Sequence, residues 1–274
     1  MKTLGEALAA ARAAGMARLD AQLLLGHVLG RDRAWLLAHD DASLSGEQAA
    51  RLEALVARRR AGEPVAYLLG EKEFHGLTLQ VDARVFVPRP DTEVLVDWAI
   101  ELLRGELAAI EQPAVLDMGT GSGAIALAVK HACPSAALTA TDASSEALSV
   151  AQTNAARLGL AVEFRLGAWW QAVAQRRFHL ALSNPPYIAA ADPHLAALTA
   201  EPSMALTPGP EGLEALRAIV AGSAAHIEAG GWLLLEHGFD QAEAVQALLR
   251  DAGFERIATR QDLGGQPRCT GARR

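Results

Sequence analysis

The sequence predicts an α/β protein with a doubly wound, mostly parallel sheet of seven strands and a small helical bundle before it. Beyond residue 91, short apolar stretches alternate with amphipathic ones, and units that alternate in this way form parallel sheets covered by helices on both faces. Before residue 73, apolar residues recur at helical spacing. Between the two parts lies a stretch of alternating apolar and polar residues, which is typical of a β-hairpin. We therefore expect a helical domain at 1–73, a hairpin linker at 74–90 and an α/β domain at 91–274.

Length and composition restrict the class of protein. At 274 residues, of which 51% are hydrophobic, the chain can bury the cores of two unequal domains. A formal net charge of −7 argues against direct nucleic-acid binding, which normally needs a basic surface. The two cysteines, Cys133 and Cys269, have no paired spacing, so neither a disulfide framework nor a metal site is expected. No uncharged run approaches the length that spans a membrane, and we expect a cytoplasmic monomer.

The first domain is expected to consist of short helices separated by glycines. Ser45, followed three residues later by Gln48, forms a capping box at the start of one helix. The Gly-Glu-Pro sequence at 62–64 then ends that helix. No residue of this domain carries an obvious catalytic group, so we expect it to recognise a substrate.

The linker and the start of the second domain are predicted from changes in the spacing of apolar residues. Alternation at 74–87, with a turn near Asp82, indicates the hairpin, and a helix begins after 90 with Asp91 or Thr92 as its N-cap. The long irregular connection at 188–210 is expected to be a binding loop or a lid. The expected strands are 114–117, 137–142, 162–166, 178–183, 232–237, 255–260 and 268–272, and the helices between them are 124–131, 145–158, 212–229 and 241–252.

The first strand of this sheet runs into a glycine-rich turn. The turn comprises Gly119, Thr120, Gly121, Ser122 and Gly123. Its spacing is not that of the dinucleotide fingerprint, but its glycines allow a ligand to approach the backbone. Asp142 ends the next strand, about twenty residues further on, where a carboxylate can accept the hydroxyls of a ribose. After the third strand, an indole of Trp169 or Trp170 can lie against a purine ring, although core packing is an equal alternative for either one.

The fourth strand ends in Asn184, Pro185, Pro186 and Tyr187. The two prolines have no N–H and fixed φ angles, so the preceding carbonyls stay free to accept hydrogen bonds. With the Asn184 amide and the Tyr187 ring, this loop suits a planar group that carries an NH2, such as a carboxamide or the amino group of a base. A plain turn at the end of a strand is the alternative for this segment taken alone.

Taken together, these segments resemble a known family. The stretch at 117–123, Asp142 and the loop at 184–187 are similar to the three signatures of class I S-adenosylmethionine-dependent methyltransferases that act on amide or amino nitrogen. The helical N-terminal part and the segments at 62–64, 88–93, 201–206 and 235–238 narrow the match. Over essentially its whole length, the chain resembles the peptide chain release factor glutamine methyltransferases of the HemK/PrmC type.

This resemblance implies a Rossmann-like methyltransferase sheet and a role for each site residue. Gly119 to Gly123 would line the methionine and ribose end of S-adenosylmethionine, Asp142 would hold the ribose hydroxyls, and Trp169 would border the adenine. Asn184 and the carbonyl of Pro185 would hold the amide of the glutamine in the Gly-Gly-Gln sequence of a release factor, with Pro186 and Tyr187 beside it. The products would be the N5-methylated glutamine and S-adenosylhomocysteine. Members of the family often have an acidic residue just before this Trp, where the present chain has Ala168.

Two other functions stay open at this point. The loop at 184–187 also suits an adenine-N6 methyltransferase of nucleic acids, against which the net negative charge argues. A binding protein with a decayed cofactor pocket is the second, and Ala168 is its one supporting feature. The chain's own Gly-Gly-Gln at 264–266 is interpreted as a turn before the last strand rather than as a site of self-methylation. His75, His179 and His237 are interpreted as structural, and no general base is assigned.

Overall fold

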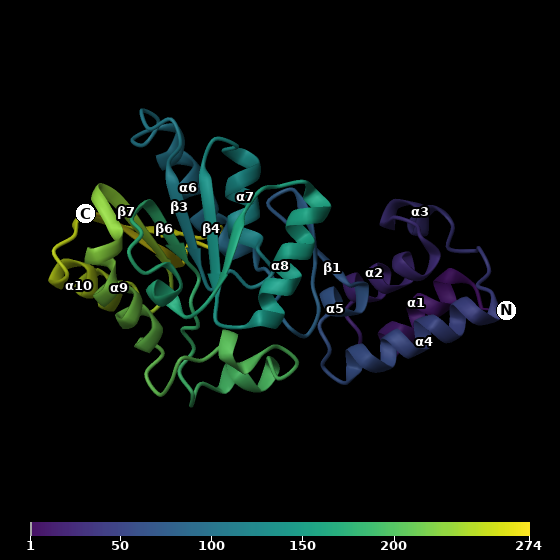
Figure 1. Cartoon of the computed structure of the whole chain (residues 1–274). Coiled ribbons are helices and arrows are strands. Elements are labelled where there is room, and N and C mark those ends of the chain that lie inside the picture. The colour runs from purple at the N-terminus through teal and green to yellow at the C-terminus, as the bar shows by residue number, and fades with distance from the viewer. Residues whose placement is uncertain (1) are drawn as a thin grey trace. The chain divides into compact units, whose positions relative to one another are not determined.

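The computed structural model describes residues 2–274, which form two compact units. The first unit extends to Glu71 and the second runs from Lys72 to Arg274 (Figure 1). Among the described residues, no helix combines the length and the apolar character that crossing a membrane requires.

The first unit is helical, as the glycine-punctuated pattern predicts. The structure places helices at α1 (Leu4–Ala13), α2 (Arg18–Leu29), α3 (Arg33–Ala38), α4 (Gly46–Arg60) and α5 (Val65–Leu69). The Ser45 hydroxyl accepts a hydrogen bond from the backbone N–H of Gln48, and the Gln48 side chain accepts one from the N–H of Ser45, which confirms the predicted capping box. Leucines at helical spacing fill the core of this unit, among them Leu4, Leu24, Leu25, Leu36 and Leu44.

The hairpin differs from its predicted place and belongs to the core of the second unit. Its strands are β1 (Glu71–Phe74) and β2 (Leu77–Gln80), so pairing begins three residues before the predicted linker and the turn lies at His75 and Gly76, not near Asp82. Gly76 and His75 both have a positive φ, and this left-handed geometry permits the tight turn. The charged residues that precede Phe74 concealed this first strand from an argument based on alternation. The hairpin is anchored by Asn154, whose side-chain amide pairs with both backbone groups of Gln80.

The second unit contains the predicted seven-stranded sheet. Its strands are β3 (Ala114–Met118), β4 (Ala137–Asp142), β5 (Glu163–Leu166), β6 (Phe178–Ser183), β7 (Ile227–Glu236), β8 (Glu255–Gln261) and β9 (Pro267–Arg273). They are ordered β5-β4-β3-β6-β7-β9-β8, and β9 alone runs antiparallel to its neighbours. The chain leaves β3 toward β4 and later returns to β6 on the other side of β3. The strand order therefore reverses at β3 and β6, where doubly wound sheets bind their ligands.

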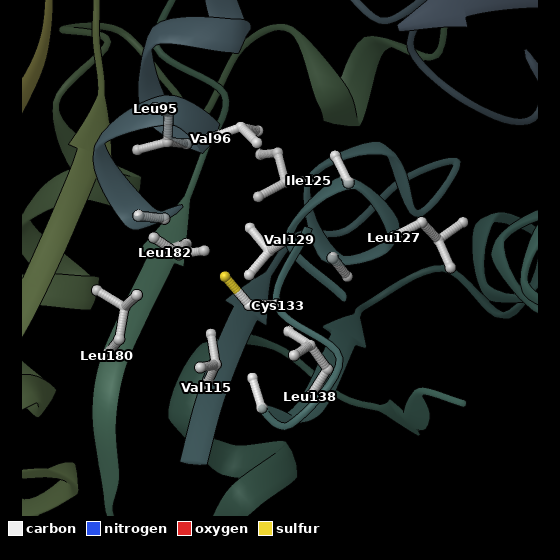
Figure 2. Packing of buried hydrophobic residues seen from close by; sticks show 14 of the residues in the cluster. Leu95, Val96, Val115, Ile125, Leu127, Val129, Cys133, Leu138, Leu180 and Leu182 are labelled. Atoms are coloured by element: carbon white, nitrogen blue, oxygen red, sulfur yellow. The ribbon is translucent and has the colours of Figure 1, made fainter. Parts of the chain in front are cut away.

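Helices cover both faces of this sheet and create two apolar cores. They are α6 (Glu93–Arg104), α7 (Ala124–Ala132), α8 (Ser145–Leu158), α9 (Glu214–His226) and α10 (Ala242–Asp251), with short 3-10 turns η1 (Pro90–Thr92), η2 (Trp169–Val173), η3 (Pro193–Ala197) and η4 (Ser203–Ala205). Figure 2 shows the first core, in which Leu95 of α6 and Val129 of α7 lie over Val115, Leu180 and Leu182 of the sheet. Residues of α9 and α10 form the second core on the other face.

The predicted boundary between the helix at 212–229 and the strand after it is also wrong. The helix expected at 212–229 ends at His226, and β7 begins at Ile227, five residues earlier than expected. Ile227 pairs with Phe178, and the register then shifts before Trp232 pairs with Leu180. Gly230 adopts a φ of +78° in this irregular stretch, a conformation that glycine tolerates without strain. The bulge hides the strand from a periodicity argument, because the residues around it do not alternate.

Candidate active site

A cavity of about 570 Å³ lies in the second unit, at the carboxyl ends of β3, β4 and β6. Its wall includes the glycine-rich turn, Asp142, the loop at 184–187, parts of the segment 83–92 and, from the long connection, Leu198, Pro202, Met204, Ala205 and Leu206. This volume is typical of small-molecule sites, which combine an apolar wall with a few polar groups. The structure thus brings most of the residues singled out in the sequence to one cavity.

The glycine-rich turn presents its backbone to this cavity. Gly119, Gly121 and Gly123 have φ values of 71°, 57° and 86°, which side chains with a Cβ rarely adopt. The N–H groups of Gly119 and Thr120 both donate to the carbonyl of Thr141, which ties the turn to β4. Gly119, Thr120, Gly121 and Ser122 line the cavity. Gly123 serves the packing behind it, because a Cβ there would lie 3.2 Å from the Cβ of Ala151 in α8.

Asp117 lies beneath the turn and holds its shape. It is fully buried, and its Oδ2 accepts hydrogen bonds from the Thr120 hydroxyl at 2.6 Å and from the Ala126 N–H at 3.2 Å. Burial raises the pKa of Asp117 to about 7. Its Oδ1 has no hydrogen-bond partner among the described residues. Asp117 was expected only as part of the motif at 117–123, with no function for its carboxylate.

Asp142 stands at the end of β4, as predicted, and lines the cavity half-buried. Its Oδ2 accepts a hydrogen bond from the Gly121 N–H and its Oδ1 from the Ser144 N–H, both at 2.9 Å. Burial raises the pKa of this carboxyl, and the backbone donors partly offset that effect. Because each carboxylate oxygen accepts more than one hydrogen bond, the side chain retains capacity to bind a ribose hydroxyl.

The two tryptophans have different environments. Trp170 belongs to the core, where its Nε1 donates to the carbonyl of Ile219 at 2.7 Å and its ring stacks on His226. Trp169 is half-buried, and a Cβ on Gly119 would lie 3.6 Å from its ring. Trp169 does not line the cavity described above. Its backbone has a positive φ of 48°. Its contact with the adenine stays a prediction.

The loop at 184–187 supplies the opposite wall. Asn184, Pro185, Pro186 and Tyr187 all line the cavity. The Asn184 Nδ2 donates to the Thr92 hydroxyl at 3.1 Å, and the Tyr187 hydroxyl donates to Glu236 at 3.3 Å. Thr92 was expected as a helix cap, and it does occupy the N-cap position of α6, but its side chain makes no capping hydrogen bond. Thr92 and Glu236 are thus functional candidates that the sequence analysis missed.

Glu236 ends β7 and is 1% exposed. Burial raises its pKa to about 7, and the Thr92 hydroxyl, the charge of Arg268 and the Tyr187 hydroxyl act in the opposite direction. The motif at 235–238 contains this residue, but nothing in its spacing indicated that the carboxylate would reach residues of two other segments. The neighbouring His237 is structural, as predicted, since its ring nitrogens contact the Gly238 carbonyl and the Thr270 hydroxyl.

The long connection at 188–210 is held near its middle by hydrogen bonds to Glu201. Glu201 is buried, and its carboxylate accepts hydrogen bonds from the Val87 N–H at 3.0 Å and from the Arg89 guanidinium. The two ends of the connection meet where the Ala190 N–H donates to the Gly209 carbonyl at 2.9 Å. The connection is therefore an ordered wall of the cavity in this structure.

The residues present fit S-adenosylmethionine. The turn offers backbone that a ligand can approach closely, Asp142 offers a carboxylate for a ribose, and the cavity has the size of a nucleoside with an amino acid attached. Among the described residues, no group of three or more His, Cys, Asp and Glu side chains could hold a metal ion.

Comparisons with known proteins agree with this architecture. Residues 3–70 match the PrmC N-terminal domain, and residues 92–249 match the methyltransferase small domain. A release factor glutamine methyltransferase of Bordetella pertussis is 50% identical over 260 residues, which cover 94% of this chain and 95% of the relative. A release factor glutamine methyltransferase of Xylella fastidiosa is 46% identical over 267 residues, covering 96% of each. The chain belongs to the release factor glutamine methyltransferase family.

Membership in this family confirms the resemblance inferred from the three signatures. The chain is an S-adenosylmethionine-dependent methyltransferase. Among solved structures, the N-terminal domain of human METTL16 in complex with SAH superposes with a TM-score of 0.54 at 14% identity, covering 84% of each chain. At this identity the likeness concerns the fold alone, and it agrees with the Rossmann-like sheet. Similarity along the whole chain thus shows the family to which the chain belongs, and the topology of the sheet shows the methyltransferase fold.

Proposed function

We propose that the chain transfers a methyl group from S-adenosylmethionine to the side-chain amide nitrogen, N5, of the glutamine in the Gly-Gly-Gln sequence of a peptide chain release factor. The observation that carries this proposal is the cavity wall in which the loop at 184–187 faces the glycine-rich turn and Asp142. One side of the cavity suits a nucleoside and the other a planar amide. The names of relatives that match this chain along nearly its whole length support the same reaction.

The substrate amide needs positioning more than activation by a base. Its nitrogen is a poor nucleophile, because the lone pair is shared with the carbonyl. With one amide N–H directed at the Oδ1 of Asn184 and the other at the Pro185 carbonyl, the nitrogen would be oriented for transfer by these two acceptors alone. When bound, the cofactor supplies a methyl group attached to a sulfonium, and S-adenosylhomocysteine remains. The methylated amide nitrogen then loses its proton to water.

Asn184, Pro185, Pro186 and Tyr187 would therefore form the substrate side of the site, with Asn184 and Pro185 in direct contact with the reacting amide. Gly119, Thr120, Gly121, Ser122 and Asp142 would form the cofactor side, with Gly123 packed behind the turn, and Trp169 would border the adenine. The buried environment of Tyr187 raises the pKa of its hydroxyl, so this residue acts as a hydrogen-bond donor and not as a base.

Mass spectrometry of a release factor tests the proposal. The purified chain is incubated with the factor and isotope-labelled S-adenosylmethionine, and the peptide containing Gly-Gly-Gln is sequenced. We expect one labelled methyl group on the glutamine and none on a factor in which alanine replaces that glutamine. Label on an adenine-containing oligonucleotide in a parallel reaction would instead favour a nucleic-acid substrate. Label on Gln266 of the chain itself would show self-methylation.

The first unit is the proposed recognition module. A Gly-Gly-Gln tripeptide offers few atoms, so selection of one glutamine among many requires contacts away from the chemistry. Its residues 3–70 match a domain model of their own. We expect that removing residues 1–71 reduces activity on an intact release factor far more than on a short peptide. Cofactor affinity of the shortened chain, measured by calorimetry, controls for folding, and equal fractional losses on both substrates would contradict the role.

The remaining partner assignments follow from charge. A net charge of −7 favours a protein substrate over a nucleic acid, and the working form proposed is a cytoplasmic monomer. Light scattering tests the monomer, and fluorescence of the tagged protein in a bacterial cell tests the location.

A further inference from the structure

The side chain of Gln241 joins three separate segments of the second unit. It stands at the N-cap position of α10, but it makes no capping hydrogen bond. Its Oε1 accepts a hydrogen bond from the Gly238 N–H at 2.9 Å, while its Nε2 donates to the Tyr187 carbonyl at 3.1 Å and to the Gly212 carbonyl at 3.3 Å. Because a carbonyl only accepts and an N–H only donates, the amide fits in this one orientation. Gln241 therefore holds the end of the loop at 184–187 against the segments that follow β7 and precede α9.

The backbone of the loop at 184–187 has little support of its own. Its two prolines have no N–H to donate, and their carbonyls accept no hydrogen bond from any residue that the structure describes. The peptide unit after Tyr187 is held on both sides. Its carbonyl accepts from Gln241, and its N–H, which belongs to Ile188, donates to the Leu206 carbonyl at 3.0 Å. This peptide unit is the first fixed point after the prolines, so it determines where they lie.

Tyr187 is also held at both of its ends by the segment after β7. Its hydroxyl donates to Glu236, the last residue of β7, at 3.3 Å, and its carbonyl accepts from Gln241 further along the same segment. The backbone of Gly212 comes close on another side, because a Cβ there would lie 2.5 Å from the Tyr187 carbonyl oxygen. Tyr187, which lines the cavity, is thus placed by contacts that lie outside the cavity wall.

We propose that Gln241 is a positioning residue for methyl transfer, which fixes the loop at 184–187 through the Tyr187 carbonyl. This inference rests on the proposed function, since it concerns the acceptors that receive the substrate amide. Gln241 does not line the cavity, so it acts through the loop rather than on the substrate. Without Gln241, the peptide unit after Tyr187 loses one of its two supports, and the Pro185 carbonyl is free to leave the position that orients the amide. A displacement of about 1 Å lowers a rate about a hundredfold.

Two substitutions separate the donor and the acceptor of the Gln241 amide. Gln241→Met keeps the length of the side chain and removes all three hydrogen bonds, so we expect kcat on a release factor to fall about tenfold. Gln241→Glu keeps the acceptor for the Gly238 N–H and turns a negative oxygen toward the two carbonyl oxygens. At about pH 8, where the introduced carboxyl is ionised, kcat should fall about a hundredfold.

The kinetic constants distinguish positioning from a loss of stability. KM for the release factor and Kd for S-adenosylmethionine should stay within about twofold in both variants, because the glycine-rich turn and Asp142 are unchanged. Gln246 offers a matched control in the same helix. It is half-buried and donates to the Thr259 hydroxyl at 2.8 Å, and neither residue lines the cavity. Gln246→Met should also lower the free energy of unfolding, and yet leave kcat unchanged.

An unchanged kcat in Gln241→Met would overturn the proposal. An equal fall of kcat in Gln246→Met would overturn it as well, because the effect would then come from stability. So would a loss of cofactor affinity as large as the loss of kcat. Should Gln241→Glu fail to fold, Gln241→Met, which introduces no charge, decides alone. Failure of the wild-type chain to methylate a release factor would instead refute the proposed function, so the two failures are distinguishable.

Discussion

Asp117 and Glu236 are two buried carboxylates, one bonded to the glycine-rich turn through Thr120 and the other to the loop at 184–187 through Tyr187. Both lie at the carboxyl ends of parallel strands, burial raises the pKa of each to about 7, and each has one oxygen without a hydrogen-bond partner among the described residues. Their partners differ. Asp117 accepts hydrogen bonds from Thr120 and Ala126, which follow it within nine residues, whereas Glu236 accepts one from Tyr187, which lies 49 residues away in the sequence.

The cofactor side of the site is thus built locally, and the substrate side is assembled from separate segments. A local turn forms from its own sequence once the strand before it is in place. The substrate side forms only when β6, β7 and η1 pack against one another, so its geometry depends on the tertiary structure of the whole unit. We therefore expect changes on the cofactor side to alter affinity, and changes on the substrate side to alter turnover.

The largest effect is expected at Asn184. Asn184→Ala should reduce kcat on a release factor by about a hundredfold or more, because the reacting amide loses its orienting acceptor. Cofactor affinity should change much less, since the glycine-rich turn is untouched. Steady-state kinetics and calorimetry measure the two quantities, and near-normal turnover in a folded variant would contradict the in-line arrangement.

Asp142→Ala tests the cofactor side. We expect weaker binding of S-adenosylmethionine by about 1.5 to 3 kcal/mol, since a charged acceptor for the ribose hydroxyls is lost. The kcat at saturating cofactor should fall far less than in Asn184→Ala. Asp142→Asn is the control that keeps the size of the side chain. A Kd equal to that of the wild type would show that Asp142 does not bind the cofactor, and would contradict the contrast between the cofactor side and the substrate side.

The two buried carboxyls predict an unusual pH dependence of stability. Because their folded-state pKa values lie above the ordinary values of 3.8 and 4.5, each stabilises the fold below its ordinary pKa, and this contribution is lost as the pH rises to about 7. Each contributes a slope of about 1.4 kcal/mol per pH unit inside that window. Denaturant unfolding from pH 5 to 8 should show a shallower decline in Glu236→Gln and in Asp117→Asn than in the wild type.

The same two variants sharpen the contrast between the two sides. Asp117→Asn should raise the Kd for S-adenosylmethionine, because the turn above it loses a charged acceptor. Glu236→Gln should instead lower kcat, because Tyr187 on the substrate side loses a charged acceptor. An identical pH profile of unfolding in both variants and the wild type would mean that neither carboxyl titrates in this range.

The smallest effect is expected at Ala168. The Gly167 N–H donates to the Asp142 carbonyl at 2.9 Å, so Ala168 follows a residue fixed to the cofactor side. Ala168→Asp should tighten S-adenosylmethionine binding by about 0.5 to 1.5 kcal/mol, the range for one hydrogen bond to the adenine amino group. Calorimetry checks this, with Ala168→Asn as a control for size. No gain in a folded variant would show that this edge of the site is built differently.

The features that could be predicted from the sequence are those with a local cause. Alternating strands and helices indicated the sheet, Ser45 and Gln48 marked a helix start, and the glycine spacing at 119–123 marked a turn in which the three glycines adopt positive φ values. Each depends on residues within one turn or strand of each other. The same is true of Asp142, which the end of an apolar strand places at the cavity.

What could not be predicted depends on distant partners or on irregular backbone. Thr92 looked like a helix cap, yet its hydroxyl contacts Asn184, a partner that only the tertiary fold brings within 3.1 Å. Glu236 looked like the end of an apolar strand. The hairpin strand at Glu71–Phe74 is polar, and β7 contains a bulge. Neither strand therefore shows the regular alternation of apolar and polar residues from which strands were predicted.

The hydrogen bonds from Val87 and Arg89 to Glu201 also affect the conformational entropy of the long connection. A free connection between residues 188 and 210 would sample many shapes, and a ligand that used it as a wall would have to restrict all of them on arrival. Fixing its middle converts one long loop into two short ones, whose conformational freedom is removed when the unit folds. Binding energy from a ligand is then available for orientation rather than for ordering the wall. We therefore expect the contact at Glu201 to raise affinity although Glu201 itself does not line the cavity.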